Sequence, residues 1–243
     1  MIKKLNTRLA FLLHIEKMVR FLAKGINFLA GKSLQHKHVF VSSSLESMKR
    51  RREIDNNYFD YIRLSTLELI SYEINKKQLT GSVAELGVYK GKFARYLNRY
   101  FKDRKLFLFD TFEGFDERDI DKEKTNGFSS ATQDFSDTSV NAVLRTMPFP
   151  ENCIAVKGFF PESAKDINEE FVFVSLDADL YDPIYAGLQF FYSRLVIGGY
   201  IFIHDFNNEN YRGVRQAVQQ FCEEQNISYT PIPDSAGTAI ITK

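Results

Sequence analysis

From about residue 57 to the C-terminus, short apolar runs alternate with stretches that have the spacing of amphipathic helices. Each run is strand-sized and apolar on both faces, which is typical of a parallel sheet covered by helices. The five runs are residues 82–86, 105–109, 153–157, 171–176 and 200–203. This alternation predicts an α/β fold with right-handed crossovers and a doubly wound, mostly parallel sheet.

The segments around these runs complete the predicted fold. A helix is expected to lead into the first strand over residues 58–74, and further helices over residues 93–101, 184–195 and 213–225. Two last runs, 227–232 and 238–242, are joined by Asp-Ser-Ala-Gly, a turn sequence. We expect them to form an antiparallel pair that closes one edge of the sheet.

Length and composition limit the remaining possibilities. A chain of 243 residues fits one large domain or one domain with an appendage, and 23 Phe in a 44% hydrophobic sequence can fill a substantial core. Global disorder and fibrous repeats are excluded. The two cysteines, Cys153 and Cys222, offer neither a disulfide framework nor a Cys-x-x-Cys metal site, so we expect a reducing, cytoplasmic location.

The N-terminal segment differs from the rest of the chain. Residues 1–32 hold seven Lys and Arg against Glu16 alone, a charge of +6 that leaves −5 for the rest. Apolar residues from Leu5 to Leu29 recur at steps of three or four, which predicts an amphipathic helix. It would pack on the main domain or on a sister subunit, giving a homodimer, or dock on an anionic membrane such as the inner membrane surface.

This pattern also suggests the domain organisation. Residues 1–56 are predicted to form a basic helical extension and linker, and residues 57–243 the main domain. The charges of Glu16, Lys17 and Arg20 argue against a membrane-spanning segment and against an export signal. A second basic run at residues 49–52 is the only other cationic feature, so no nucleic-acid partner is expected.

Four of the five predicted parallel strands end in a carboxylate. Glu85, Asp110, Asp177 and Asp205 stand at or directly after the ends of the first, second, fourth and fifth runs. In open α/β sheets, ligands bind outside the carboxyl ends of the strands. The aligned acids therefore predict a binding site at that edge, although Asp179, shortly after the fourth run, is better suited to cap the following helix.

The loop after the first strand indicates which ligand binds there. Gly87 and Gly91 allow a close backbone approach, but the dinucleotide pattern Gly-x-Gly-x-x-Gly is absent, and Glu85 stands where its first glycine would be. A carboxylate there disfavours a pyrophosphate and suits an ammonium group. Asp110 suits the hydroxyls of a ribose. Together these acids fit S-adenosylmethionine better than NAD.

Five segments resemble the macrocin O-methyltransferase family. They are AELGVYKG at 84–91, LFLFDTFEGF at 106–115, KGFFPE at 157–162, LDADLY at 176–181 and IGGYIFIHDF at 197–206. The likeness runs from about Arg63 to the C-terminus. It implies a class I S-adenosylmethionine-dependent enzyme with a Rossmann-like, seven-stranded sheet, which methylates a hydroxyl of a sugar, a glycan or a related natural product.

The resemblance also implies the binding of the donor. The methionine moiety would lie near residues 85–91, the ribose on Asp110 and the adenine near Gly158 and Phe159. The full set of donor-binding residues expected from these loops is Glu85, Gly87, Tyr89, Gly91, Asp110, Thr111, Phe112, Gly158, Phe159 and Asp177.

A divalent metal, usually magnesium, is a further implication of the resemblance. Its ligands would be the aspartate after the fourth strand and an Asp-Asp pair after the fifth, here Asp177, His204 and Asp205. His204 replaces the first aspartate of the pair. Since magnesium prefers oxygen ligands, manganese, another metal or no metal remain alternatives. With a metal, Asp177 and Asp205 would present it to the acceptor; without one, His204 is the candidate general base.

The sequence also predicts a lid and allows two alternative functions. The polar stretch 116–138 is long for a loop in a compact domain, and we expect it to fold over donor and acceptor as a lid. A non-catalytic module that binds the donor, a membrane or a partner is one alternative function, and an NAD-dependent sugar oxidoreductase is another. Hydrolases are excluded because Gly-x-Ser-x-Gly is absent.

Overall fold

The computed structural model describes Met18, Phe21, Leu22 and residues 60–243. The chain divides into two units, Met1–Glu53 and Ile54–Lys243, and the elements below belong to the second. Met18, Phe21 and Leu22 are helical. The rest of the predicted N-terminal helix and the predicted boundary at residue 56 lie outside the described residues and stay predictions. Within the described residues, none of the helices combines the length and the hydropathy that a bilayer crossing requires.

The second unit is built on one seven-stranded sheet with the order β3-β2-β1-β4-β5-β7-β6. The first five strands in this order pair in parallel, and β7 runs antiparallel to both β5 and β6. The strands are β1 (Ser82–Leu86), β2 (Leu106–Asp110), β3 (Cys153–Lys157), β4 (Phe171–Leu176), β5 (Leu195–Ile203), β6 (Thr230–Ile232) and β7 (Thr238–Thr242). The predicted α/β class and the antiparallel edge pair are confirmed.

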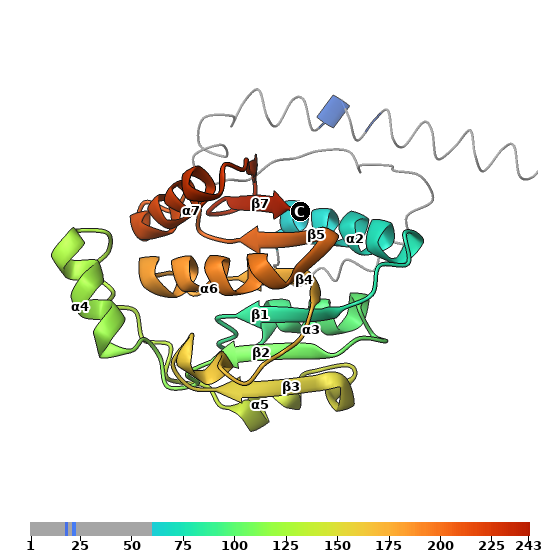
Figure 1. Cartoon of the computed structure of the whole chain (residues 1–243), viewed down its shortest axis with the longest axis horizontal. Coiled ribbons are helices and arrows are strands. Elements are labelled where there is room, and N and C mark those ends of the chain that lie inside the picture. Colours follow the sequence, from blue (N-terminus) through green and yellow to red (C-terminus); the bar gives the residue numbers. More distant parts are fainter. Residues whose placement is uncertain (1–17, 19–20, 23–59) are drawn as a thin grey trace, which may run out of the picture. The chain divides into compact units, whose positions relative to one another are not determined.

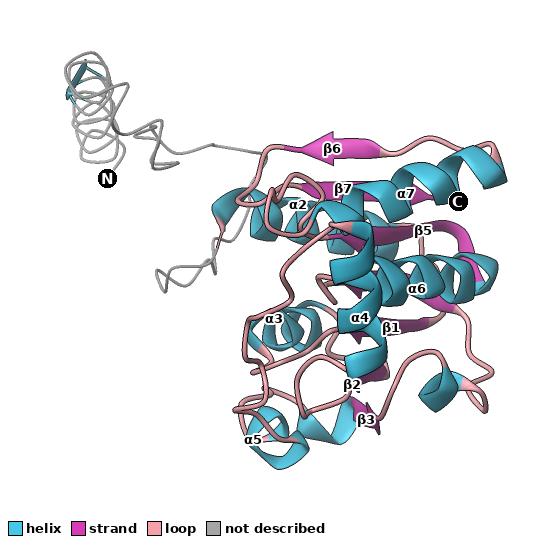
Figure 2. Ribbon diagram, turned by 90° about the vertical axis from the view of Figure 1, so that its left-hand side faces the viewer, coloured by secondary structure: helices cyan, strands magenta, loops and turns pink. Residues whose placement is uncertain are grey.

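The helices cover both faces of the sheet. They are α2 (Tyr61–Lys76), α3 (Lys92–Tyr100), α4 (Glu117–Asn126), α5 (Val140–Leu144), α6 (Tyr181–Arg194) and α7 (Arg212–Gln225), with 3-10 turns η1 (Pro150–Asn152) and η2 (Glu162–Ala164). Figure 2 shows α6 and α7 on one face of the sheet and α2 and α3 on the other. Each face has its own apolar core, and both cores are rich in Phe.

β2 lies one residue later than predicted, over Leu106–Asp110, and β6 begins at Thr230 rather than at residue 227. Two further strand predictions need correction. β5 begins at Leu195 rather than at residue 200, and Gly198, with φ +83°, lies where the register of β5 against β4 shifts between Leu195 and Tyr200. β3 was expected to be buried on both faces, but it is the edge strand, and its side chains are half-buried or exposed, Ile154 by 37%. Besides the neighbouring strand β2, the short elements α5 and η2 lie against it.

The predicted lid is partly helical. In Figure 1, α4 stands beyond the arrowheads of the parallel strands, where their carboxyl ends meet. Asp116 caps α4 by accepting a hydrogen bond from the backbone N–H of Arg118, acidic residues occupy the first turn, and Gly127 ends the helix with φ +66°. The expectation of a polar loop over residues 116–126 was therefore wrong, since the cap and the C-terminal glycine were visible in the sequence.

Candidate active site

Gly87 brings the loop after β1 against the end of β4. Its φ is +85°, and a Cβ at this position would lie 2.2 Å from the carbonyl oxygen of Asp177. The backbone N–H of Gly87 donates to Phe109 O, and that of Asp177 donates to Leu86 O. Only glycine therefore fits here, and its small size lets the carboxyl ends of β1, β2 and β4 meet.

Asp110 ties the first two strand-end loops together. Its Oδ2 accepts hydrogen bonds from the backbone N–H groups of Val88 and Tyr89 at 2.7 and 2.8 Å. Its Oδ1 accepts one from Phe112 at 2.6 Å. The carboxylate thus has a structural role that the sequence did not reveal. The predicted contact between Asp110 and a ribose stays a prediction. A ribose hydroxyl would donate to Oδ1, which can accept a further hydrogen bond.

A cavity opens at these strand ends, lined by residues that follow β1, β2, β3 and β4. Six of the predicted donor-binding residues line it, namely Gly87, Asp110, Thr111, Gly158, Phe159 and Asp177. Tyr89, Gly91 and Phe112 lie in the adjoining loops but do not line the cavity. Backbone glycines, a ribose-compatible carboxylate and aromatic rings in one cavity are the features that an adenosyl ligand requires.

Glu85 lies deeper than expected. It is only 1% exposed and does not line the cavity, and its Oε2 has no hydrogen-bond partner among the described residues. Burial, followed by the charge of Asp177, raises the pKa of Glu85 well above its ordinary value. Because Glu85 is covered and does not line the cavity, its expected contact with the ammonium group of the donor finds no support in this arrangement.

Asp177, His204 and Asp205 meet at the ends of β4 and β5. Nδ1 of His204 lies 2.8 Å from Oδ2 of Asp205 and 3.0 Å from Oδ1 of Asp177. Asn208 donates a 2.6 Å hydrogen bond to Oδ1 of Asp205. The structure therefore brings the three predicted catalytic residues together, at the margin of the cavity that Asp177 itself lines.

Arg63 is a site residue that sequence reasoning missed. Both terminal nitrogens of its guanidinium lie 3.1 Å from Oδ2 of Asp177, and one also donates to Ser175 at 3.2 Å. Arg63 is 3% exposed and lies on α2, which the sequence analysis treated as a covering helix. A charged residue on the inner face of a predicted helix was the available signal, since buried arginines are rare without a partner.

Burial and neighbouring charges shift the pKa values of the residues in this cluster. Burial opposes the charge of His204, but Asp177 outweighs it and raises the pKa of His204 to about 10. Burial likewise opposes the charge of Asp177, while His204 and Arg63 hold its pKa below the ordinary value. Burial, with Asp205 and Asp177, raises the pKa of Asp179 well above its ordinary value. Nδ1 of His204 thus lies between the two carboxylates and helps to hold them in place, whereas its predicted role as general base, which needs the neutral imidazole, stays a prediction.

Four of the eight non-glycine residues with positive φ in the described part of the chain follow the parallel strands at this edge of the sheet. Tyr89, Phe112, Asp179 and Asp205 have φ values of 49°, 54°, 61° and 59°, in the left-handed region that non-glycine residues rarely adopt. They follow β1, β2, β4 and β5 respectively. Such strain clusters at functional sites, because the surrounding structure must hold it.

The donor atoms of the cluster fit a divalent cation. One atom each from Asp177, His204 and Asp205 lie within 4.8 Å of one another, and Arg63 occupies the other oxygen of Asp177. Two carboxylate oxygens and an imidazole nitrogen suit manganese or a similar transition metal better than magnesium. The predicted ligand set is thus assembled.

The segment after β2 covers the cavity. The ring of Phe135 packs edge-on against Tyr89 and Phe115, with centroids 5.0 and 5.1 Å away. Arg118 stacks on the ring of Phe159 at 3.5 Å. These contacts place one end of the predicted lid against Phe159 of the predicted adenine site and the other end against Tyr89 and Phe115. The movement of the lid stays a prediction.

Comparisons with known proteins bear on the family and the fold of this chain. The family model described as Macrocin-O-methyltransferase (TylF) matches residues 28–240. No curated protein matches the chain. Among solved structures it is similar to the O-methyltransferase NovP, with 17% identity, 74% of this chain and 79% of that chain covered, and a TM-score of 0.58. It is also similar to the calicheamicin methyltransferase CalS11, with 18% identity, 74% and 78% covered, and a TM-score of 0.59.

At such identities the solved structures show the fold, while the family match spans most of the sequence. The match includes β1 to β6, the first part of β7 and all of the predicted site residues. The chain therefore belongs to the macrocin O-methyltransferase family, and it is an S-adenosylmethionine-dependent O-methyltransferase of a sugar or related natural-product hydroxyl.

Proposed function

We propose that methyl transfer takes place beside Asp177 and Asp205, with the donor in the adjoining cavity and the acceptor hydroxyl at the cluster. One observation carries this proposal: Asp177 both lines the cavity and contacts His204 of the cluster. A donor in the cavity and a hydroxyl at the carboxylates would therefore be neighbours, and such placement of two reactants supplies a large part of the rate acceleration.

The reaction requires an in-line displacement at a sulfonium. The acceptor oxygen forms a bond to the methyl carbon, the carbon–sulfur bond breaks, and the hydroxyl proton leaves. The carboxylates of Asp177 and Asp205 would accept a hydrogen bond from that hydroxyl and receive its proton. Arg63, His204 and Asn208 would hold these carboxylates in place through the contacts described above.

A divalent cation is part of the proposal. Asp177, His204 and Asp205 would hold it, and when bound it would supply Lewis-acid chemistry that lowers the pKa of the acceptor hydroxyl. Chelation followed by addition of single metals tests this directly. We expect EDTA to abolish transfer and manganese to restore more activity than magnesium, and His204→Asp to reverse that preference. Full activity in EDTA would contradict a metal role.

Asp205→Asn tests the site itself. Labelled S-adenosylmethionine and a panel of glycans and glycosides would measure transfer, and calorimetry with S-adenosylhomocysteine would measure donor binding. We expect transfer to fall about 100-fold or more, with donor affinity nearly unchanged. Asp166→Asn, an exposed acid outside the site, is the control. An active Asp205→Asn enzyme would remove Asp205 from the reaction, and a wild-type chain without donor binding would refute the proposal as a whole.

The positive charge of the N-terminal segment suggests where in the cell this reaction takes place. The charge of +6 on residues 1–32 supports peripheral attachment of the cytoplasmic enzyme to an anionic membrane, with a glycan or small-molecule acceptor delivered there. Flotation of the full chain with phosphatidylserine vesicles, compared with neutral phosphatidylcholine vesicles, tests this. Equal behaviour with both, together with a dimer in solution, would favour the homodimer interpretation.

A further inference from the structure

A polar groove lies next to the acidic cluster, between the segment that follows α4 and the connection from β5 to α7. Its two adjoining hollows share the lining residues Gly127, Phe128, Glu209 and Arg212. Most of the remaining lining residues carry amide or hydroxyl groups, and they include Asn126, Asn207, Gln216, Gln219, Ser130 and Thr132. Groups of this kind form hydrogen bonds with sugar hydroxyls.

Two arginines give this groove its charge. Arg212 and Arg215 are exposed, one helical turn apart at the start of α7. Within the part of the chain that the structure describes, neither has a carboxylate oxygen within 4 Å, and Glu209 is the only acid that lines the groove. The two positive charges are therefore not compensated locally.

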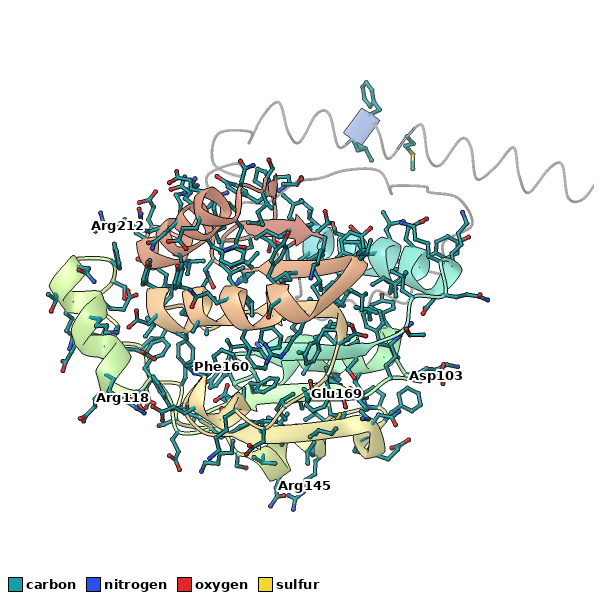
Figure 3. All side chains as sticks on the ribbon, viewed as in Figure 1. Asp103, Arg118, Arg145, Phe160, Glu169 and Arg212 are labelled. Carbon is teal, nitrogen blue, oxygen red and sulfur yellow. The ribbon has the colours of Figure 1, made fainter. Side chains whose placement is uncertain are left out.

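Both guanidinium groups are nevertheless held in place. Arg212 donates a 3.0 Å hydrogen bond to the carbonyl oxygen of Gly127, at the end of α4 where Figure 3 labels it. Arg215 stacks over the ring of Phe206 at 4.3 Å and donates to Asn207. Each retains further N–H donors, since a guanidinium carries five. Positioned donors lose less side-chain entropy when a ligand binds.

Two residues that line the groove contact the proposed reaction centre. Asn208 lines the groove and donates its hydrogen bond to Asp205. Tyr211 also lines the groove, and its ring packs against Phe115 of the donor cavity with centroids 6.5 Å apart. A ligand held at the arginines would thus be separated from Asp205 by the side chain of Asn208, which contacts both the groove and Asp205.

We propose that the acceptor is a phosphorylated sugar, whose phosphate or diphosphate binds Arg212 and Arg215 while its hydroxyl faces Asp205. This inference rests on the proposed function of the Asp177 and Asp205 cluster. Two guanidinium groups match the charge of about two that a phosphate ester carries near neutral pH, and their planar forks pair with phosphate oxygens in bidentate fashion. The amide-rich remainder of the groove binds the sugar hydroxyls.

Calorimetry on the full chain with S-adenosylhomocysteine bound tests the groove. The probes are UDP-glucose, glucose 1-phosphate and inorganic pyrophosphate, with neutral methyl glucoside and glucuronic acid for comparison. We expect the phosphate-bearing probes to bind at least tenfold more tightly than the two comparison sugars. A nucleoside diphosphate sugar as natural acceptor predicts that UDP-glucose binds best, whereas a simple sugar phosphate predicts that glucose 1-phosphate does.

Substitution of the arginines completes the test. Arg212→Gln and Arg215→Gln should each weaken the phosphate-bearing probes about tenfold, and the double variant more, while S-adenosylhomocysteine affinity stays unchanged. Arg145→Gln is the matched control, because Arg145 is exposed on another part of the surface (Figure 3). Equal binding of phosphorylated and neutral sugars, or full phosphate affinity in the double variant, would overturn the inference while leaving donor binding and methyl transfer intact.

Discussion

The guanidinium of Arg63 lies against the carboxylate of Asp177, with both terminal nitrogens 3.1 Å from Oδ2. The two residues are 114 positions apart in the sequence and come from α2 and the end of β4. This contact leaves Oδ1 of Asp177 directed to His204. Arg63 thus compensates the buried charge of Asp177 and determines which oxygen faces the reaction centre.

Arg63→Ala is expected to destabilise the fold and to abolish transfer. Loss of one partner of a buried ion pair leaves the other charge uncompensated, which costs about 3 to 5 kcal/mol of unfolding free energy. Urea denaturation measures the stability and a labelled-donor assay the activity. Arg63→Lys, which keeps the charge but not the fork, should recover most of the stability and less of the activity. Wild-type activity in Arg63→Ala would show that Asp177 needs no such orientation.

Gly87→Ala should disrupt the site more than the same change at another left-handed glycine. A Cβ at Gly87 would lie 2.2 Å from backbone oxygen, whereas none of the described atoms lies within 4 Å of a Cβ at Gly127. Both positions have positive φ, so Gly127→Ala isolates the cost of the backbone conformation, about 1 kcal/mol. Thermal unfolding and donor calorimetry compare the two variants; similar losses in both would show that the close approach is unimportant.

Asp110→Asn is expected to weaken donor binding by about tenfold or more, because its carboxylate accepts charge-assisted hydrogen bonds that position both loops. Hydrogen exchange at the amides of Val88 and Tyr89, measured without ligand, separates this structural role from a ribose contact. Faster exchange indicates loss of the loop contacts. Glu113→Gln, an exposed change in the same loop, is the control. Unchanged donor affinity would place the nucleotide elsewhere.

Asp119 should make stability depend on pH. Burial, then the charges of Asp182 and Asp116, raise its pKa to about 7 in the folded protein. Between that value and the unfolded pKa of about 4, the folded state binds the proton and the unfolded state does not, so stability falls as pH rises from about 4 to 7. Asp119→Asn should raise the melting temperature at pH 8 and flatten this dependence. Asp121→Asn, exposed on the same helix, should change neither.

Movement of the segment over the cavity can be measured by proteolysis. Arg118, Lys122 and Lys124 are exposed trypsin sites on α4. If the segment opens to admit ligands, S-adenosylhomocysteine should slow cleavage there several-fold, because bound ligand favours the closed state. Cleavage after Arg145, an exposed site outside this segment, provides the reference. Equal rates with and without ligand would argue against a lid.

Much of the fold followed from local patterns. The runs that became β1, β3, β4 and β7 have the predicted bounds, because apolar stretches of strand length between turn residues report burial directly. Parallel strands place their carboxyl ends at one edge, so the meeting of Asp177, His204 and Asp205 could be expected before any contact was known. The position of β3 at the edge of the sheet could not be predicted, because hydrophobic periodicity does not indicate the order of the strands.

The sequence by itself determined the class of fold, the family and the edge of the sheet where the chemistry takes place. Tertiary structure decided how the acids at that edge behave: Glu85 is buried away from the cavity, Asp110 holds backbone amides, and Arg63 compensates Asp177. The reason is physical. Periodicity reports only whether a residue is buried, whereas charge state and hydrogen bonding depend on distances between side chains that are remote in the chain.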